Sequence, residues 1–306
     1  CDGQVDEACQ VPLALGAGPR HPAVCGSGEL VVVVDDALWR LTEDGAGAWQ
    51  AGPIEAATSD IPAAHPACSA SLVAWLTTPE PCLAPADGPA HCPRASVWAL
   101  DTDQAFDLTG QSTPGRPAVH DDLLMWHAVV GERPLLKRHD RGQRGVRDVA
   151  PELALSDPVP LGPERWAARQ WVGGQAEGVL WQGAAFDDGL VPVRPSGPPA
   201  AGARWAVWAL GEQALWAVPL TGSARTGFQI TASPGPHRAP RVVGDHVVWI
   251  DEGAGVLRHA DLGTGVSAAL FAGAVHPDDL AAGPDRVAWI ADGADGPALF
   301  QHRLAD

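Results

Sequence analysis

A phrase of about forty residues recurs along this chain, and it constrains the fold more than any other feature of the sequence. Residues 239–251 (APRVVGDHVVWID) read as a short strand, a Gly-Asp turn and a β-branched strand that contains Trp249. The matching residues of the seven copies are Val33, Trp75, Trp126, Ala168, Trp208, Trp249 and Trp289. They are separated by 42, 51, 42, 40, 41 and 40 residues, so the chain contains seven units.

Each unit is predicted to form four short strands. In the sixth unit, two further apolar segments, 257–260 and 268–271, follow the phrase. The 35 glycines and 29 prolines favour many short elements joined by turns. Four strands in about forty residues are typical of one propeller blade. We therefore predict an all-β, seven-bladed propeller, in which the one long spacing reflects a loop inserted at about residues 77–95 of the second blade.

The seventh unit ends at Asp306 after only three strands. The apolar segment Val11–Leu15 precedes the first unit, and we expect it to supply the missing fourth strand of the last blade. Such closure joins the two ends of the ring and removes an open sheet edge. The predicted organisation is a tether at residues 1–10 and a propeller at residues 11–306.

The phrase Pro240 to Asp251, followed by DLGTG at residues 261–265, resembles the TolB-like, WD40-like β-propeller repeat of bacterial envelope and cell-surface proteins. The resemblance implies the fold and leaves function open, because such propellers include adaptors, polysaccharide-active enzymes and accessory domains of peptidases. The repeated tryptophans are predicted to pack between blades, and stacking on sugars is the alternative.

Charge and motifs exclude several classes of function. The chain carries 20 Lys and Arg against 37 Asp and Glu, a net charge of −17, which disfavours nucleic acid as a partner. No apolar run approaches the length of a membrane-spanning helix. The motifs of serine hydrolases, P-loop enzymes, dinucleotide-binding enzymes and zinc proteases are absent, so we predict no catalytic activity.

All six cysteines lie within the first 92 residues, and none forms a Cys-x-x-Cys pair, which disfavours zinc. Disulfides are the expected alternative in an exported chain. Cys82 and Cys92 flank the predicted loop and are expected to bridge it. Cys25 and Cys68 follow His21 and His65 by four and three residues on adjacent inner strands, so we predict that they pair.

The first residue, Cys1, resembles the lipidated cysteine of a mature bacterial lipoprotein. The resemblance implies a lipid on Cys1, a polar tether behind it, and an exported protein that faces the periplasm or the cell exterior. Contact with the membrane would then be through the lipid anchor only. The alternative is an ordinary chain boundary or a disulfide cysteine.

Four histidines are predicted to face one mouth of the central channel. His21, His65 and His276 each precede a proline at the start of a unit, and His237 lies three residues before Pro240. Some TolB-like propellers are pectate-fragment lyases that hold a divalent metal with histidines near this face, and imidazole suits such metals. The favoured interpretation needs no cofactor, because each His-Pro pair can serve as a repeated loop residue.

These observations favour a non-catalytic envelope lipoprotein that acts as a protein-binding scaffold or as an accessory subunit of a membrane-associated complex. Its partners would be other envelope proteins. One alternative is a metal-dependent, lyase-like enzyme that acts on carbohydrate through the histidine cluster. Another is a module that binds glycans or peptides without turnover.

Overall fold

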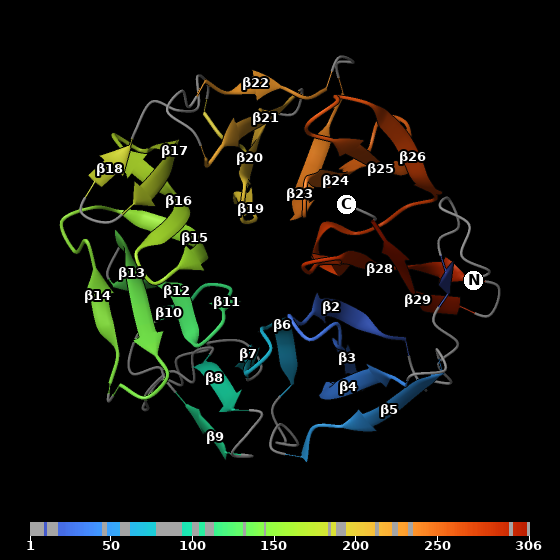
Figure 1. The fold of residues 1–306 in the computed structure, drawn as a ribbon. Helices are drawn as coiled ribbons and strands as arrows, with labels where there is room; N and C mark the ends of the chain where they lie inside the picture. Colours follow the sequence, from blue (N-terminus) through green and yellow to red (C-terminus); the bar gives the residue numbers. More distant parts are fainter. Residues whose placement is uncertain are drawn as a thin grey trace, which may run out of the picture.

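Seven four-stranded units surround a central channel in the computed structural model (Figure 1). The structure describes residues 9–10, 18–44, 48–55, 62–77, 94–99, 104–107, 113–130, 133–143, 145–182, 185–187, 194–211, 214–221, 226–231, 235–293 and 296–304. Successive blades follow one another around the ring in sequence order. Within each blade the strands are antiparallel neighbours, and the first of them lies nearest the channel. The predicted seven-bladed, all-β propeller is confirmed.

The first three blades contain the strands β2 to β14. Blade one contains β2 (Arg20–Val24), β3 (Leu30–Val34), β4 (Ala37–Glu43) and β5 (Trp49–Pro53). Blade two contains β6 (Ala63–Cys68), β7 (Leu72–Thr77), β8 (Arg94–Ala99) and β9 (Gln104–Asp107). Blade three contains β10 (Thr113–Pro114), β11 (Ala118–His120), β12 (Leu123–Val130), β13 (Arg133–Asp140) and β14 (Arg147–Val149). Both β10 and β11 pair with β12, so together they form one interrupted inner strand.

The remaining blades repeat this order. Blade four contains β15 (Leu155–Gly162), β16 (Arg165–Val172), β17 (Gln175–Gln182) and β18 (Ala185–Asp187). Blade five contains β19 (Ala200–Ala201), β20 (Trp205–Leu210), β21 (Ala214–Pro219) and β22 (Phe228–Gln229). Blade six contains β23 (His237–Val243), β24 (His246–Asp251), β25 (Val256–Asp261) and β26 (Ser267–Ala272). Blade seven contains β27 (Leu280–Ala282), β28 (Arg286–Gly293) and β29 (Gly296–Arg303), preceded by the 3₁₀ turn η2 (Pro277–Asp279).

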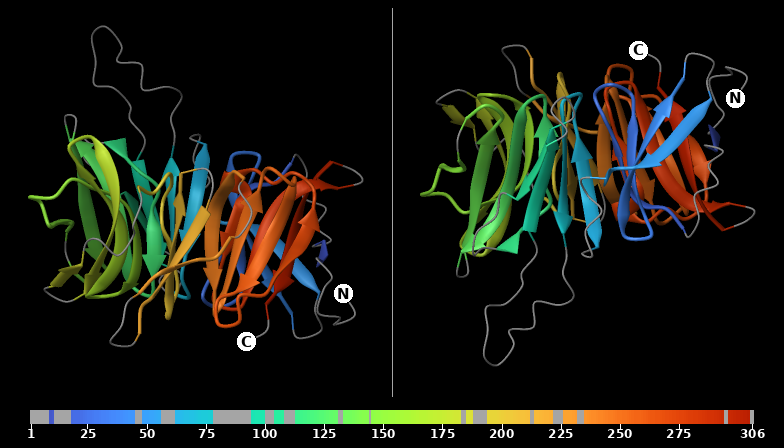
Figure 2. Two further views of the ribbon diagram at one scale, coloured as in Figure 1. Left: turned by 90° about the horizontal axis from the view of Figure 1, so that it is seen from above. Right: turned by 90° about the horizontal axis from the view of Figure 1, so that it is seen from below.

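An N-terminal strand closes the last blade, as the sequence predicts. β1 (Cys9–Gln10) pairs antiparallel with β29 through Cys9 opposite Gln301 and Gln10 opposite Phe300. The whole of this strand lies in the segment that the sequence assigns to the tether, and that assignment is wrong for Cys9 and Gln10 because both pair with β29; Val11–Leu15 lie outside the described residues. Seen edge-on, the strands of every blade cross the thickness of the ring (Figure 2). In the described residues, no helix is long and apolar enough to cross a membrane.

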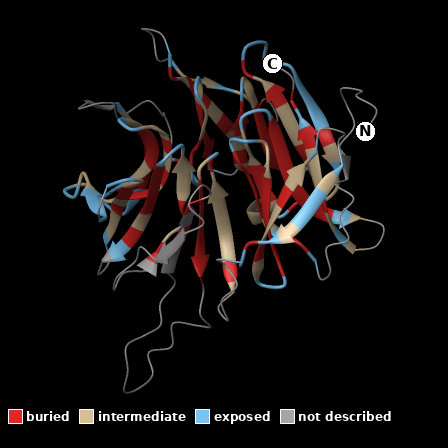
Figure 3. Ribbon diagram, turned by 60° about the horizontal axis from the view of Figure 1, so that its bottom comes forward, coloured by how far each residue is buried: buried red, intermediate tan, exposed pale blue. Residues whose placement is uncertain are grey.

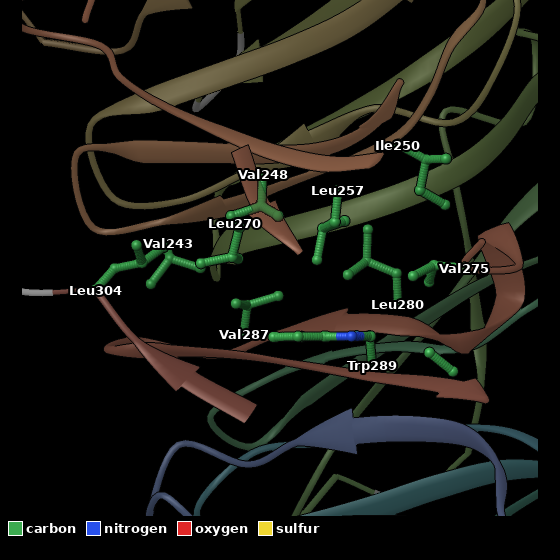
Figure 4. Close-up of a cluster of buried hydrophobic side chains, with 11 residues drawn as sticks. Val243, Val248, Ile250, Leu257, Leu270, Val275, Leu280, Val287, Trp289 and Leu304 are labelled. Atoms are coloured by element: carbon green, nitrogen blue, oxygen red, sulfur yellow. The ribbon is translucent and has the colours of Figure 1, made fainter. Parts of the chain in front are cut away.

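The core consists of separate apolar layers between neighbouring blades. Buried residues concentrate on the second strand of each blade, and exposed ones on outer strands and turns (Figure 3). Between blades six and seven, Val248 and Leu257 face Val287 and Trp289 (Figure 4). Four other repeated tryptophans lie in equivalent layers, which places them between blades rather than on the surface: Trp75, Trp126, Trp208 and Trp249.

The register corrects one residue of the sequence alignment. In blade two, Ala67 pairs with Ala74, the residue before Trp75. In blade one, the equivalent Ala23 pairs with Val31. The counterpart of Trp75 is therefore Val32, which packs toward blade seven, and not Val33.

Candidate functional site

The inner strands share one irregularity that points side chains at the channel. In β2, β6, β15 and β23, the pairing with the next strand shifts register at an X-Pro pair. The residue before each proline has a positive φ, between 47° and 51°, which is unusual for a residue with a side chain: His21, His65, Asp157 and Ala239. Such a bulge redirects one side chain without ending the strand. Blade three has its break at Arg116-Pro117, between β10 and β11.

These bulges line a cavity of about 450 Å³ in the channel. Inner strands or adjoining turns of all seven blades contribute to its wall, which is largely alanine, valine and proline. Its ionisable lining residues are His21, His65, Arg116, His120, Asp157, Arg165, Arg241 and Asp278. The described lining contains no Phe or Trp ring. The cavity therefore combines an apolar wall with a few charged groups, which is typical of a small-molecule site.

His21 and His65 meet at one side of this cavity. Their rings stack with centroids 4.3 Å apart, and the His65 amide donates to Nδ1 of His21 over 3.5 Å. The His21 amide in turn donates to a carboxylate oxygen of Asp279 in blade seven, over 2.8 Å. Asp278 completes a group of three whose potential ligand atoms all lie within 4.8 Å of one another.

Burial keeps the two imidazoles neutral. Desolvation, followed by the positive charge of Arg116, lowers the pKa of His65 to about 4. Desolvation also lowers the pKa of His21. Partial burial acts to raise the pKa of Asp278, but the hydrogen bond and charge of Arg116 outweigh it, so that this pKa is below its ordinary value. At neutral pH the group therefore contains two neutral rings and one carboxylate.

Two guanidinium groups lie in the same cavity. Arg116 of blade three forms an ion pair with Asp278 of blade seven. Arg241 of blade six donates from Nε to the Leu280 carbonyl over 2.9 Å and from a terminal nitrogen to the Pro240 carbonyl over 2.9 Å. Desolvation, followed by the charge of Arg116, lowers the pKa of Arg241 to about 10, so its side chain stays positive at neutral pH.

The other two predicted histidines do not join this group. His237 is buried, with its ring edge-on to Trp249 at a centroid distance of 6.3 Å. The bulge of blade six is at Ala239, two residues later. The His237 side chain therefore packs against Trp249 within blade six and does not line the channel. His276 is exposed and caps η2, accepting from the Asp278 amide over 3.3 Å. This turn displaces it from the channel wall.

A disulfide joins Cys25, directly after the inner strand of blade one, to Cys68, the last residue of the inner strand of blade two, with Cα atoms 4.8 Å apart. This is the pair that the repeat register predicts. Cys1, Cys82 and Cys92 lie outside the described residues, so the predicted lipid attachment and loop bridge do too.

Sequence analysis missed Arg116, Arg241 and Asp278. A signal for Arg116 is present, because Arg116-Pro117-Ala118 repeats the pattern of His21-Pro22-Ala23. The His-Pro pattern alone instead indicates His276 as a residue of the channel mouth. Asp278 offers no such signal, since blade seven has a 3₁₀ turn where other blades have the bulge.

Comparisons with known proteins show the fold alone. No family model matches this chain, and no curated protein matches it. The human WBSCR16 structure aligns over 95% of this chain and 88% of its own, with 9% identity and a TM-score of 0.65. The CRINKLY WD40 ectodomain of the Arabidopsis thaliana receptor kinase ACR4 aligns over 92% and 95%, with 12% identity and a TM-score of 0.55. TolB from Acinetobacter baumannii aligns over 71% of this chain and 55% of its own, with 13% identity and a TM-score of 0.49.

Proposed function

We propose that this chain is a non-catalytic binding propeller, which acts in the bacterial cell envelope as a protein-binding scaffold or as an accessory subunit of a membrane-associated complex. The observation that carries the proposal is an exposed, pre-ordered aromatic group at the turn between β16 and β17. Trp171 is 39% exposed and Val172 is 46% exposed. The end of β12 in the neighbouring blade adds the exposed Val129. β12 and β16 are each the second strand of their blade, so both strands end at the same face of the ring, and the exposed side chains at those ends lie on that face.

Trp171 is held in place before any partner arrives. Its indole N–H donates to Ser156 Oγ over 3.0 Å, and the Arg169 guanidinium lies 5.6 Å from its ring centre. Arg169 is fixed in turn by Asp157, over 2.7 Å from its Nε. A rigid tryptophan next to an arginine is typical of energetic hot spots in protein interfaces, because little side-chain entropy is lost on binding.

Site-specific photo-crosslinking in the native cell tests this function. A photoreactive amino acid at position 172 should trap the same protein partner in repeated experiments, and Trp171→Ala should abolish its co-purification. Val266→Asp is the matched control, because Val266 is 68% exposed in the turn between β25 and β26, away from this face. Retention of every partner by Trp171→Ala would contradict the proposal. Adducts that contain only glycan would favour the glycan-binding alternative.

The metal-dependent enzyme is the second candidate, and it rests on the His21, His65 and Asp278 group. The chemistry of these ligands suits a divalent transition metal, and the neutral rings keep their lone pairs. The charges of Arg116 and Arg241 oppose a dication in the same cavity. Metal analysis decides: a stoichiometric transition metal in wild type that is lost in His65→Ala would favour the enzyme.

Export and anchoring through Cys1 belong to the same proposal. The Cys25–Cys68 disulfide supports a compartment outside the reducing cytoplasm. Intact mass spectrometry of the protein from its native membrane should show a lipid-modified Cys1. An unmodified Cys1, or a chain confined to the cytosolic fraction, would contradict the anchoring.

A further inference from the structure

We propose that the central channel binds a small molecule that carries one carboxylate on an apolar body, with Arg241 as its anchor and Arg116 as the second cation. This site goes beyond the proposed protein-binding face: the two meet at Asp157, which lines the cavity and holds Arg169 beside Trp171, but binding in the channel needs no protein partner. It begins from the partly buried guanidinium of Arg241, for which no described side chain provides a negative partner.

Three backbone carbonyls orient the Arg241 guanidinium. Besides its bonds to Leu280 and Pro240, it donates from the other terminal nitrogen to the Pro277 carbonyl at 3.5 Å. A guanidinium has five N–H groups, so within the described part of the chain each terminal nitrogen keeps one N–H without an acceptor. Two such N–H groups on one plane match the two oxygens of a carboxylate.

The charge of Arg241 is costly where it lies. Burial lowers its pKa to about 10, and it forms no ion pair with any carboxylate among the described residues. Asp278, whose negative charge acts to raise the pKa of Arg241, is already bound by Arg116. An unpaired charge that is partly withdrawn from water is unfavourable unless a counter-ion compensates it. A bound carboxylate would supply that counter-ion.

The lining also has the opposite charge balance to the protein as a whole. Three arginines and two aspartates line the cavity, a formal balance of +1, although the chain carries −17. Asp157 is neutralised by Arg169 outside the lining. An anion therefore meets a locally favourable field inside an acidic molecule.

The rest of the wall selects the class of anion. Alanine, valine and proline side chains suit an aliphatic body, and the described wall offers no aromatic ring on which a sugar could stack. Asp278 repels a second negative charge beside Arg116, which disfavours phosphate relative to a single carboxylate. The rings of His21 and His65 add hydrogen-bonding groups to the same wall.

Calorimetric titration of the full chain tests this site, with hexanoate as the probe. Hexanoate should bind saturably at one site, and hexanamide, which lacks the charge, should bind at least about tenfold more weakly. Arg241→Gln should weaken hexanoate by about tenfold or more, and Arg116→Gln should weaken it less, because Asp278 already uses part of its charge. Arg204→Gln is the control, since Arg204 pairs with Asp245 on the surface and does not line the cavity.

Two further measurements keep the proposal open to refutation. If Arg241→Gln fails to fold, Arg241→Lys retains the charge without the planar fork, and the half-exposed Arg116 can be tested alone. No saturable binding of hexanoate to folded wild type would overturn the proposal, as would equal binding by wild type and a folded Arg241→Gln. Inorganic phosphate that binds more tightly than hexanoate would overturn the assignment of a carboxylate. Manganese binding that requires His65 and excludes hexanoate would overturn the anion site.

Discussion

Opening the Cys25–Cys68 disulfide should destabilise the whole ring by an amount that follows from its position. The bridge joins the ends of the inner strands of adjacent blades and spans 43 residues of sequence. In the chain-entropy picture, a closed loop of this size restricts the unfolded chain by about 4 kcal/mol. For a chain of 306 residues, an unfolding entropy of ~2.1 cal/mol/K per residue converts this free energy to a fall of about 6 °C in Tm.

The assay is scanning calorimetry of wild type and of the double variant Cys25→Ala/Cys68→Ala, each with and without reductant. Reductant opens the Cys25–Cys68 bridge in wild type and any other disulfide in both proteins. Without reductant, the difference in Tm between the two proteins contains the effect of the bridge and the effect of the packing of two sulfur atoms. The difference in the presence of reductant contains the packing alone. Subtracting the difference in reductant from the difference without reductant gives the change in Tm that is due to the bridge.

The chain-entropy reasoning is refuted if the subtracted shift is within about a degree of zero while thiol mapping shows that wild type is oxidised. A shift well above the predicted value would indicate that the bridge also holds the folded blades together. Cys25 is fully buried, so the measurement in reductant should itself show a smaller destabilisation of the variant.

Three other perturbations have defined outcomes. Deleting residues 1–16 removes β1 from the edge of β29 and should lower Tm throughout the ring; a change of only a degree or two would contradict closure by this strand. Lowering the pH from 6.5 to 4 should cost roughly 1–2 kcal/mol through His65, because burial and Arg116 hold its folded pKa at about 4 while the unfolded ring binds a proton near 6.5; urea unfolding should show a weaker pH dependence in His65→Gln. Trp208→Ala should cost about 3–5 kcal/mol in the same assay, against about 1 or less for Trp171→Ala, because only the first empties an inter-blade layer.

The fold was predictable because the same apolar layer must be built between every pair of blades. A tryptophan at one position of the second strand fills that layer, and its spacing counts the blades. The predicted alignment is wrong by one residue in blade one, because its second strand contains no tryptophan. All residues from Val31 to Val34 are buried and apolar, since this strand is covered on both faces, so no polar position fixes which valine faces which neighbour.

The site was predictable only where sequence and geometry repeat together. His21 and His65 were found because both precede a proline at the bulge. Asp278 and Arg241 reach the cavity through other local geometry, a 3₁₀ turn and the second residue after the bulge of blade six. Convergence of these side chains depends on closing the ring, which brings blade seven against blade one. A contact of this kind joins residues 258 positions apart, as in His21 with Asp279, and no local pattern encodes it.

The prolines of the inner strands explain why ligand recognition in the channel would depend on the side chains beside them. Each inner strand is a sheet edge that faces the channel, and such an edge would accept an extra strand. Proline at positions 22, 66, 117, 158, 199 and 240 removes an N–H donor from that edge, which opposes pairing with a peptide backbone. Recognition in the channel therefore falls to side chains.

The side chains at and beside these bulges are unevenly distributed around the ring. Blades one to four present His21, His65, Arg116 and Asp157 at this position, whereas blades five and six have Pro198 and Ala239. Asp278 and Arg241 add their charges to the side already occupied by the histidines and Arg116. A ligand held symmetrically on the channel axis would draw on all blades alike. Asp157 is held by Arg169, and the other carboxylate of the lining, Asp278, lies with Arg116 near Arg241, whereas blade five lines the cavity with proline, alanine and glycine alone; this favours a molecule with a charged end and an apolar end lying across the channel.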